Sequence, residues 1–417
     1  MRAVHSDEVR VPALRLEGFE GEWSETTLGQ VSYRSAEKNS DLTYSETFTN
    51  SAQNGVVSQL DYFDNQVSNA ANVGGYYVVK PGDFVYNPRL SVTAPVGPLN
   101  RNDLSRTGIV SPLYTVFTLT GLDSDFTKWL FKGQTWHRYM QTAGDSGVRG
   151  DRLSISNADF FDMPLKAPSR EEQRLIGDYL NRVETLVDST ALRLTSLTSF
   201  KKTMLVKMFP QGTASTPEVR FEGFEGDWGN GTLGDIGRTY TGLSGKTKED
   251  FGHGDGRFVT YMNVFSNPVL DPSKVEPTPV DSRQNTIRNG DVLFTTSSEV
   301  PDEAGMSCVV DGVDGDVYLN SFCFGFRPNQ SIERDYWAYM LRSRSVRNQF
   351  EMLAQGISRF NISPTRAMAV EVPLPSLPEQ QAIGSYFRNL DALIEAEQKK
   401  LDTLRNLKSA LLTQMFV

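Results

Sequence analysis

The sequence predicts an α+β protein made of two tandem copies of one unit, each a sheet-rich globular domain followed by a long amphipathic helix. Two observations predict this organisation. Blocks of sequence recur at a nearly constant displacement, and short β-favouring stretches give way to long runs with helical apolar spacing. The length of 417 residues suits two or three domains, each large enough to bury its own core.

The strongest repeats lie at the two ends of each copy. Leu14-Arg-Leu-Glu-Gly-Phe-Glu-Gly-Glu-Trp23 returns as Val219-Arg-Phe-Glu-Gly-Phe-Glu-Gly-Asp-Trp228, and each is followed by Thr-Leu-Gly. The closing block Pro168-Ser-Arg-Glu-Glu-Gln-Arg-Leu-Ile-Gly returns as Pro375-Ser-Leu-Pro-Glu-Gln-Gln-Ala-Ile-Gly, and the copies end in Lys-Met-Phe and Gln-Met-Phe. The middles match poorly. This pattern is expected if the copies share a fold and an assembly role but differ in what their middles contact.

Weaker sequence matches relate the central parts of the two copies. The stretch 81–86 (Pro-Gly-Asp-Phe-Val-Tyr) matches 289–294 (Asn-Gly-Asp-Val-Leu-Phe), and Arg152-Leu-Ser-Ile-Ser matches Arg359-Phe-Asn-Ile-Ser. Pro210 and the polar run after it mark a linker between the copies. We therefore expect a first globular domain, a first helix, a linker, a second globular domain and a second helix, with bounds 1–168, 169–209, 210–218, 219–374 and 375–417.

The globular parts carry short β-favouring stretches bounded by Gly, Pro, Asn and Asp, such as Gly75–Val79 and Phe258–Tyr261. Each part also has one late helical stretch, near 124–141 in the first copy and 333–355 in the second. These mixed elements are the reason for the α+β prediction.

Both long helices have an apolar seam with the alternating three-and-four spacing of a coiled coil. Ser169 can cap the first helix, and acidic residues follow it where they complement the helix dipole. Thr190 and Lys201 interrupt the first seam, and Glu397 and Lys408 interrupt the second at the same places. The seam residues are Ile176, Leu180, Val183, Val187, Leu194 and Leu197, and then Ile383, Phe387, Leu390, Ile394, Leu401 and Leu404.

Two arrangements of these helices are open. Each could lie on its own domain, or the two could pack against each other, which suits helices of about 39 residues with a narrow seam. At 1.5 Å per residue each would extend about 55 to 60 Å. An antiparallel pair of that length would be a spacer between the globular domains.

Charge is unfavourable for general nucleic-acid binding, because the net charge is −9 and such binding depends on Lys and Arg neutralising phosphates. Local positive clusters remain. Residues 128–152 hold five basic and two acidic residues, and residues 327–366 hold seven basic and three acidic residues. A solvated charged face would explain these clusters equally well, but Arg and Asn are also the side chains that read base edges.

Composition argues against metal chemistry, secretion and membrane insertion. The two cysteines, Cys308 and Cys323, have no zinc-site spacing, and only three histidines occur. No apolar run is long enough to span a membrane, and the first residues have no apolar signal core. We expect a cytoplasmic protein with two buried thiols and no bound metal.

Catalytic motifs are weak. Ser244-Gly-Lys-Thr247 resembles the end of a phosphate-binding loop, but Tyr240 stands where its first glycine should be, so Lys246 is better interpreted as a loop lysine. Val85-Tyr-Asn-Pro-Arg89 is only partly similar to an amino-methyltransferase motif, and no glycine-rich cofactor motif precedes it. No nucleophile–base or paired-carboxylate constellation stands out. We therefore expect a protein that is not an enzyme.

Taken together, the Gly-Phe-Glu-Gly-acid-Trp openings at 18 and 223, the Pro-Ser-x-x-Glu-Gln-x-x-Ile-Gly blocks at 168 and 375, and the Met-Phe endings resemble the specificity subunit of Type I restriction–modification enzymes. The resemblance covers nearly the whole chain. It implies two target-recognition domains that each read one half of a bipartite, asymmetric double-stranded DNA site, with paired helices that set the spacing.

The resemblance also implies partners. The helices would dock two modification subunits that methylate adenine with S-adenosylmethionine, and restriction subunits would add translocation and cleavage driven by ATP with Mg²⁺. No cofactor is implied for this chain itself. The alternative is a scaffold unrelated to DNA, in which two similar domains on a coiled-coil spacer bind proteins.

Base-contacting residues do not follow from the family motif, because the recognition domains vary most. From side-chain type and loop position we expect DNA contacts from ten residues. They are Tyr86, Asn87, Arg89, Arg149 and Arg152 in the first copy, and Lys246, Tyr261, Asn263, Arg359 and Asn361 in the second.

Overall fold

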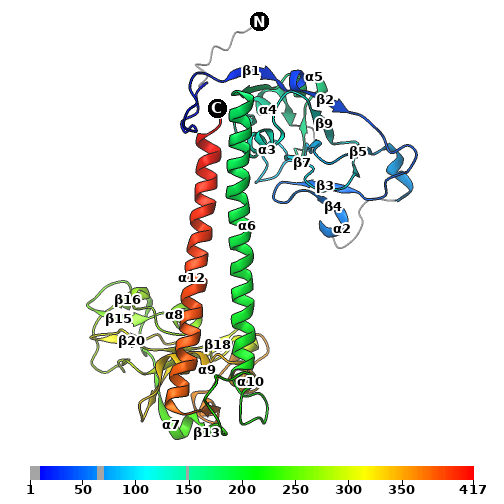
Figure 1. The fold of residues 1–417 in the computed structure, drawn as a ribbon. Helices are drawn as coiled ribbons and strands as arrows, with labels where there is room; N and C mark the ends of the chain where they lie inside the picture. Colours follow the sequence, from blue (N-terminus) through cyan, green and yellow to red (C-terminus); the bar gives the residue numbers. More distant parts are fainter. Residues whose placement is uncertain (1–9, 63–69, 147–149) are drawn as a thin grey trace. The chain divides into compact units, whose positions relative to one another are not determined.

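The computed structural model describes residues 10–62, 70–146 and 150–417 (Figure 1). Arg149 and the first nine residues, where a signal core was not expected, lie outside these residues. The chain divides into two compact units. The first unit contains the residues up to 190 together with 400–417, and the second contains 191–399. Each long helix therefore contributes one part to each unit.

The first unit is built around a four-stranded antiparallel sheet. Its strand order is β2-β9-β6-β7, and β6 is buried along its whole length at the centre. Phe84 of β6 lies directly opposite Phe117 of β9, and their rings stack with centroids 5.4 Å apart. The bounds are β2 (Ser32–Ser35), β9 (Thr115–Leu119), β6 (Phe84–Tyr86) and β7 (Leu99–Arg101).

Four two-stranded ladders and several short helices complete this unit. The ladders pair β1 (Ser24–Thr27) with β12 (Pro164–Ala167), β3 (Phe48–Ser51) with β4 (Gly55–Ser58), β5 (Tyr77–Val79) with β8 (Gly108–Val110), and β10 (Asp145–Ser146) with β11 (Leu153–Ser154). The helices are α1 (Leu28–Val31), α2 (Gln59–Tyr62), α3 (Ser124–Lys132), α4 (His137–Ala143) and α5 (Asn157–Phe161), with the 3₁₀ turn η1 (Ala70–Gly75).

The second unit repeats the four-stranded sheet with different surroundings. The order β14-β21-β17-β19 corresponds to β2-β9-β6-β7. Phe294 of β17 and Phe324 of β21 also lie opposite each other and stack, although Phe294 matches Tyr86 and lies two residues further along its strand than the residue that matches Phe84. In place of the ladders β3–β4 and β5–β8 it has a three-stranded sheet in which β15 and β20 run parallel. Similar ends and dissimilar middles are thus visible in the fold itself.

The strands of the second unit are β13 (Gly229–Thr232), β14 (Gly237–Thr241), β15 (Gly256–Val259), β16 (Val275–Thr278), β17 (Val292–Thr295), β18 (Ser297–Ser298), β19 (Ser307–Val309), β20 (Val317–Leu319), β21 (Cys323–Pro328), β22 (Phe360–Asn361) and β23 (Glu371–Leu374). Its helices are α7 (Leu233–Ile236), α8 (Tyr261–Ser266), α9 (Arg334–Met340), α10 (Arg344–Leu353) and α11 (Pro364–Ala367), with 3₁₀ turns η2 (Lys248–Asp250), η3 (Pro272–Lys274) and η4 (Pro301–Glu303).

The late helical stretches expected near 124–141 and 333–355 are each two helices rather than one. In the first unit, the Gly133 N–H caps α3 by donating to the Trp129 and Leu130 carbonyls, and α4 begins only after a turn. In the second unit, α9 ends at Met340 and Ser343 precedes α10. Apolar periodicity continued across both interruptions, so the sequence pattern alone could not show them.

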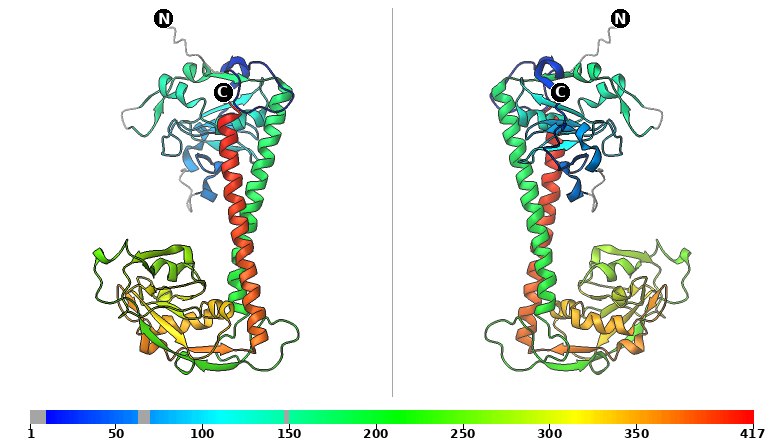
Figure 2. Two further views of the ribbon diagram at one scale, coloured as in Figure 1. Left: turned by 90° about the vertical axis from the view of Figure 1, so that its left-hand side faces the viewer. Right: turned by 90° about the vertical axis from the view of Figure 1, so that its right-hand side faces the viewer.

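The two long helices, α6 (Arg170–Lys207) and α12 (Leu377–Gln414), run antiparallel beside each other within each unit (Figure 2). In the second unit Arg193 pairs with Glu397 and Lys201 pairs with Asp391. Residue numbers therefore increase along one helix as they decrease along the other. The first turns of each helix instead pack on their own globular domain, with Ile176 and Ile383 in the two domain cores. Both arrangements left open by the sequence therefore occur along one helix.

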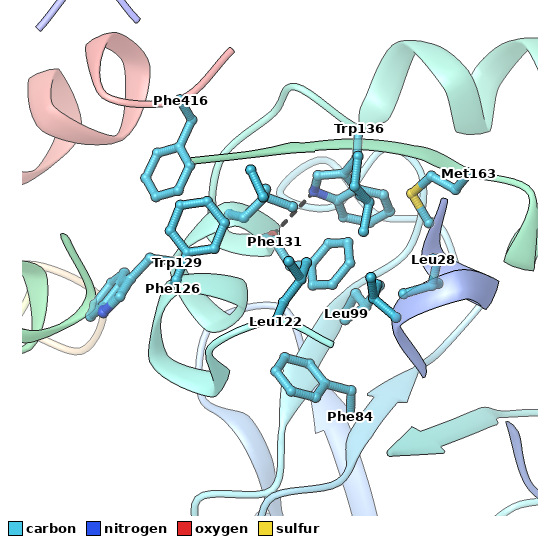
Figure 3. Close-up of a cluster of buried hydrophobic side chains, with 14 of the residues drawn as sticks. Leu28, Phe84, Leu99, Leu122, Phe126, Trp129, Phe131, Trp136, Met163 and Phe416 are labelled. Atoms are coloured by element: carbon cyan, nitrogen blue, oxygen red, sulfur yellow. Dashed lines mark hydrogen bonds between the residues drawn. The ribbon is translucent and has the colours of Figure 1, made fainter. Parts of the chain in front are cut away.

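Each repeat ends inside the core of the unit that holds the other repeat's domain. Phe416, which follows α12, packs against Trp23 and Phe126 in the first unit, as Figure 3 shows for its approach to Phe126. Phe209, which follows α6, packs against Trp228 and Tyr336 in the second unit. The two Met-Phe endings are thus exchanged between the repeats, and each completes a core that is built mainly by the other repeat.

No helix of the described residues is both long and apolar enough to cross a membrane. In the same residues, no cluster of three or more His, Cys, Asp or Glu could hold a metal ion. Cys308 and Cys323 are free and buried, and burial raises the pKa of each thiol to about 12.

Candidate nucleic-acid interface

The opening motif of each repeat anchors its domain on the first turn of its own long helix. Arg15 donates to both carboxylate oxygens of Glu172 at 2.8 Å, and Arg220 contacts Glu379 in the same way at 2.7 and 2.8 Å. Glu172 and Glu379 have side chains only 1% and 2% exposed. A carboxylate this deeply buried needs such a partner, because an unpaired buried charge is strongly unfavourable.

The helix ends extend the same anchor. The Leu14 N–H donates to the Gln414 carbonyl in the first unit, and the Val219 N–H donates to the Lys207 carbonyl in the second, both at 2.9 Å. These bonds satisfy carbonyls that the end of a helix would otherwise leave without a partner. The repeat therefore encodes the joint between domain and helices, and it leaves the far side of each domain free to vary.

The predicted seam residues are buried to different depths. Ile176, Leu180, Val183 and Val187 are buried, as are Ile383, Phe387, Leu390 and Leu401. Leu194, Leu197, Ile394 and Leu404 are half-buried. Two of the four interrupting residues are buried as well, since Thr190 and Glu397 are 3% and 7% exposed, and Lys201 and Lys408 are half-buried.

In the first unit, one of the predicted DNA-contacting residues is buried and one supports a third. Tyr86 is 1% exposed, and its hydroxyl donates to the Val96 carbonyl at 2.7 Å, so its polar atom is already used. Asn87 is 9% exposed, and its side-chain oxygen accepts the Arg89 N–H at 3.1 Å. Arg89 and Arg152 are exposed and form an antiparallel bridge. The structure thus brings together two arginines that are far apart in sequence.

In the second unit, three of the five predicted residues converge. Asn361 of β22 pairs with Ser297 of β18, and the Tyr261 hydroxyl donates to the Ser297 carbonyl at 2.7 Å. Arg359 lies two residues before Asn361, in the bend that leads into β22, and both side chains are exposed. Ser297 was missed by the sequence prediction. A signal in the sequence could have identified it. Phe294 matches Tyr86 in the aligned stretches, and Ser297 follows Phe294 by three residues just as Arg89 follows Tyr86.

The other two residues lie apart from this group. Asn263 is 2% exposed, and its amide donates to the Asp271 and Lys274 carbonyls at 2.9 Å. Lys246 pairs with Asp281 at 3.0 Å, with both side chains less than 15% exposed. Lys246 does line a cavity of about 450 Å³ next to Thr296, at the edge of the Ser297 group.

The positive cluster of residues 327–366 is mostly structural, which corrects its interpretation as a basic surface. Arg327 pairs with Asp291, and Arg334 pairs with Asp311 and Asp335. Arg342 donates to four backbone carbonyls, and Arg347 donates to three. Burial lowers the pKa of both of these guanidinium groups to about 10. Counting charges in a window cannot separate such arginines from those that face solvent.

Comparison with known proteins identifies the kind of domain. A model of the Type I restriction modification DNA specificity domain matches residues 225–406. The putative type I restriction enzyme MjaX specificity subunit of Methanocaldococcus jannaschii is 27% identical over 199 residues, which are 46% of this chain and 45% of that protein. The StySPI specificity subunit of Salmonella potsdam is 26% identical over 152 residues, or 36% of this chain and 30% of that protein. The aligned regions thus span less than half of these two relatives.

Solved structures share the fold over almost the whole chain. A Type I restriction–modification S subunit from M. genitalium has a TM-score of 0.53 at 14% identity, covering 98% of this chain and 99% of its own. A chain from a study of assembly in the type I system has a TM-score of 0.54 at 18% identity, covering 94% and 96%. The α+β fold and the resemblance to Type I specificity subunits are confirmed, and residues 225–406 match the model of a DNA specificity domain.

Proposed function

We propose that this chain is the non-catalytic DNA specificity subunit of a Type I restriction–modification complex. Each globular domain reads one half of a bipartite target, and the paired helices set the distance between the halves. One observation carries this proposal: residues 225–406 match a DNA specificity domain, and the four-stranded sheet of that region occurs a second time in the first unit. The anchors Arg15–Glu172 and Arg220–Glu379 are the clearest sign that the first repeat is the same kind of domain.

The duplication also supports two copies of one docking partner. Leu186 and Phe200 of α6 are exposed apolar residues, and the equivalent residues of α12 are Leu393 and Leu407, also exposed. Each unit therefore presents one such residue from each helix. The recurrence of these exposed apolar residues at equivalent positions of the two copies supports two equivalent protein interaction sites. Their occupants in the proposed complex are two modification subunits.

The acidity of the chain fits a complex in which other subunits bind most of the DNA phosphates. With a net charge of −9, the isolated chain is poorly suited to neutralising phosphates. In the proposed complex the modification subunits supply much of the phosphate contact, and this chain supplies base contacts. S-adenosylmethionine, ATP and Mg²⁺ act in the modification and restriction subunits, and this chain binds no cofactor.

Within each domain we assign two kinds of role to the predicted residues. Arg89, Arg152, Arg359 and Asn361 are exposed and are proposed to contact DNA directly. Tyr86, Asn87, Tyr261 and Asn263 hold neighbouring backbone through hydrogen bonds and are proposed as positioning residues. Lys246 is proposed to contact DNA at the edge of its cavity only if the Asp281 pair opens.

The experiment is to map methylated adenines in the host genome with and without this gene, the modification genes being intact. We expect one bipartite, asymmetric motif to lose its methylation when the gene is deleted and to regain it on complementation. An unchanged methylation map, with the chain expressed and its neighbours intact, contradicts the proposal and favours a protein scaffold.

A further inference from the structure

Each unit has an antiparallel bridge just beyond the buried central strand of its sheet. In the first unit the bridge joins Arg89, three residues after Tyr86 of β6, to Arg152. In the second it joins Ser297, three residues after Phe294 of β17, to Asn361. The same place in the fold therefore carries two arginines in one domain and a serine with an asparagine in the other.

Hydrogen bonds define the geometry of the first bridge. The Leu153 N–H donates to the Pro88 carbonyl, and the Leu90 N–H donates to the Asp151 carbonyl, both at 2.9 Å. The bonds flank the two arginines, which are therefore a non-hydrogen-bonded pair, the kind whose side chains lie closest, with Cβ atoms about 4.5 to 5.5 Å apart. Both side chains leave the ladder on the same face. The Asn87 side chain further fixes Arg89 by accepting its N–H.

Two arginines directly opposite each other in a bridge of this kind are unfavourable in the free protein. Like charges directly opposite each other destabilise a β ladder. In the described part of the chain neither Arg89 nor Arg152 forms an ion pair, and both are exposed. A ligand that offers closely spaced acceptors would relieve this repulsion. The O6 and N7 atoms of guanine in the DNA major groove are such acceptors, and Arg contacts them bidentately.

The second bridge has the same backbone pattern without the charge. The Ile362 N–H donates to the Thr296 carbonyl at 2.8 Å, just as Leu153 donates to Pro88. Asn361 has one amide hydrogen bonded to the Arg359 carbonyl at 3.2 Å, which leaves the second hydrogen and the side-chain oxygen for a ligand. An asparagine amide with one donor and one acceptor fits N7 and N6 of adenine.

The bridges correct the sequence alignment of the segments that contain Arg152 and Asn361. Sequence similarity matches Arg152 with Arg359, whereas the backbone pairing places Arg152 where Asn361 lies, two residues further along. A displacement by two residues keeps every side chain on its original face of a strand, whereas a displacement by one would reverse them all. The two domains can therefore share one reading face and present different side chains on it.

We infer that the exposed side chains of these two bridges are the base-reading positions of the two domains: Arg89 and Arg152 select guanine in one half-site, and Asn361, which lies opposite the buried Ser297, selects adenine in the other. The inference rests on the proposed function, because it assumes that each domain reads its own half-site. It makes the asymmetry of the target a direct consequence of which side chains stand at one repeated position.

The test is to map genomic methylation motifs for the wild type and for Arg89→Ala, Arg152→Ala and Asn361→Ala. A wild-type map without a bipartite motif rejects the proposed function itself. Given such a motif, both arginine variants should accept other bases at a guanine of one half-site, with discrimination falling about 5- to 150-fold, while the other half stays intact. Asn361→Ala should relax an adenine of the other half only.

Two further variants separate base reading from phosphate contact. Arg152→Lys keeps the charge but loses the bidentate fork, so guanine discrimination should still be lost. Arg138→Ala removes an exposed arginine of the same domain away from the bridge and should leave the motif unchanged. Full activity of Arg152→Lys, or equal loss at every base position with Arg89→Ala and Arg152→Ala, would overturn the inference in favour of phosphate binding. Unchanged melting temperatures would confirm that the exposed substitutions leave the fold intact.

Discussion

Lys201 of α6 pairs with Asp391 of α12 inside the helix pair, and the Lys201 ammonium lies 5.4 Å from the centroid of the Tyr339 ring. The repeat builds the same arrangement in the first unit. There Lys408 pairs with Glu184 and lies 5.4 Å from the Trp129 ring. Each seam lysine thus joins three elements, its own helix, the opposite helix and a domain helix, and it does so at equivalent positions of the two copies.

Replacing Lys201 by methionine should destabilise the second unit by about 1 to 3 kcal/mol, because Asp391 would keep only the Tyr339 hydroxyl bond inside a partly buried site. The comparison is Lys202→Met, which removes the exposed neighbouring charge and should change the free energy of unfolding little. Urea unfolding measures both. Equal stability of the two variants would mean that the seam lysine contributes only packing by its methylene groups.

The two opening tryptophans provide a matched pair of mutations. Trp228 Nε1 donates to Glu379 at 3.1 Å, whereas Trp23 Nε1, which is also buried, has no hydrogen-bond partner among the described residues. Substitution by phenylalanine removes similar ring volume from both cores. Trp228→Phe should therefore cost about 1 kcal/mol more than Trp23→Phe in free energy of unfolding. A larger loss from Trp23→Phe would show that its N–H has a partner in solution.

The two lysine ion pairs of the long helices show what the sequence could and could not predict. The duplication, the class of fold and the apolar seam follow from periodicity and repeated blocks, and those features depend on residue spacing alone. The roles of Lys201 and Lys408 do not follow. In sequence they are interruptions of a seam, and only the packing shows that an acid and an aromatic ring surround each one.

The reading positions were harder to predict, for a physical reason. Tyr86 and Asn263 have side chains suited to DNA contact, but burial uses their polar atoms inside the domain. Ser297 has no distinctive chemistry and is notable only for its place opposite Asn361. The pairing register that brings Arg89 to Arg152 depends on tertiary contacts across more than sixty residues, which a local pattern does not encode.

Stability should decline at alkaline pH partly because of the two buried thiols. Burial raises the pKa of Cys308 and Cys323 to about 12 from 9.0, so the native state holds both protons where the unfolded state releases them. Their contribution is present below about pH 9 and is lost as the pH rises from 9 towards 12. The variant Cys308→Ala/Cys323→Ala should show a shallower decline over that range in urea unfolding.

The same burial predicts chemical inertness of the thiols. Iodoacetamide at pH 8 should leave Cys308 and Cys323 unmodified in the folded chain and alkylate both in urea, because only an accessible thiolate reacts. Mass spectrometry gives the fraction modified. Rapid modification of the native chain would contradict the burial of both residues.

Because the Met-Phe endings are exchanged between the repeats, each should stabilise the domain of the other. Phe416→Ala should destabilise the first unit, and Phe209→Ala the second, each by about 3 to 5 kcal/mol, since both rings are buried among aromatic partners. Hydrogen exchange read separately for β6 and β17 distinguishes the two units. Loss of protection in the second unit with Phe416→Ala, and none in the first, would contradict the exchange.

The repeated exposed residues on the long helices make a prediction about stoichiometry. Leu186 and Leu393 are equivalent positions, 49% and 38% exposed, one in each unit. If they dock two copies of one partner, Leu186→Lys or Leu393→Lys should each reduce the co-purified modification subunit from two copies to one, and the double variant should retain none. Neither change should lower the melting temperature, because a lysine on an exposed helical face loses little packing.

The control is Leu192→Lys. Leu192 is 69% exposed on the same helix, but its equivalent in the second copy is Lys399, so the repeat does not preserve an apolar residue there. This variant should keep two copies of the partner, as measured by native mass spectrometry of the complex. Loss of partner with Leu192→Lys as well would indicate that any added charge on the helices disrupts docking. Retention by the double variant Leu186→Lys/Leu393→Lys would place the docking surface elsewhere, and the repeated apolar positions would then have no part in assembly.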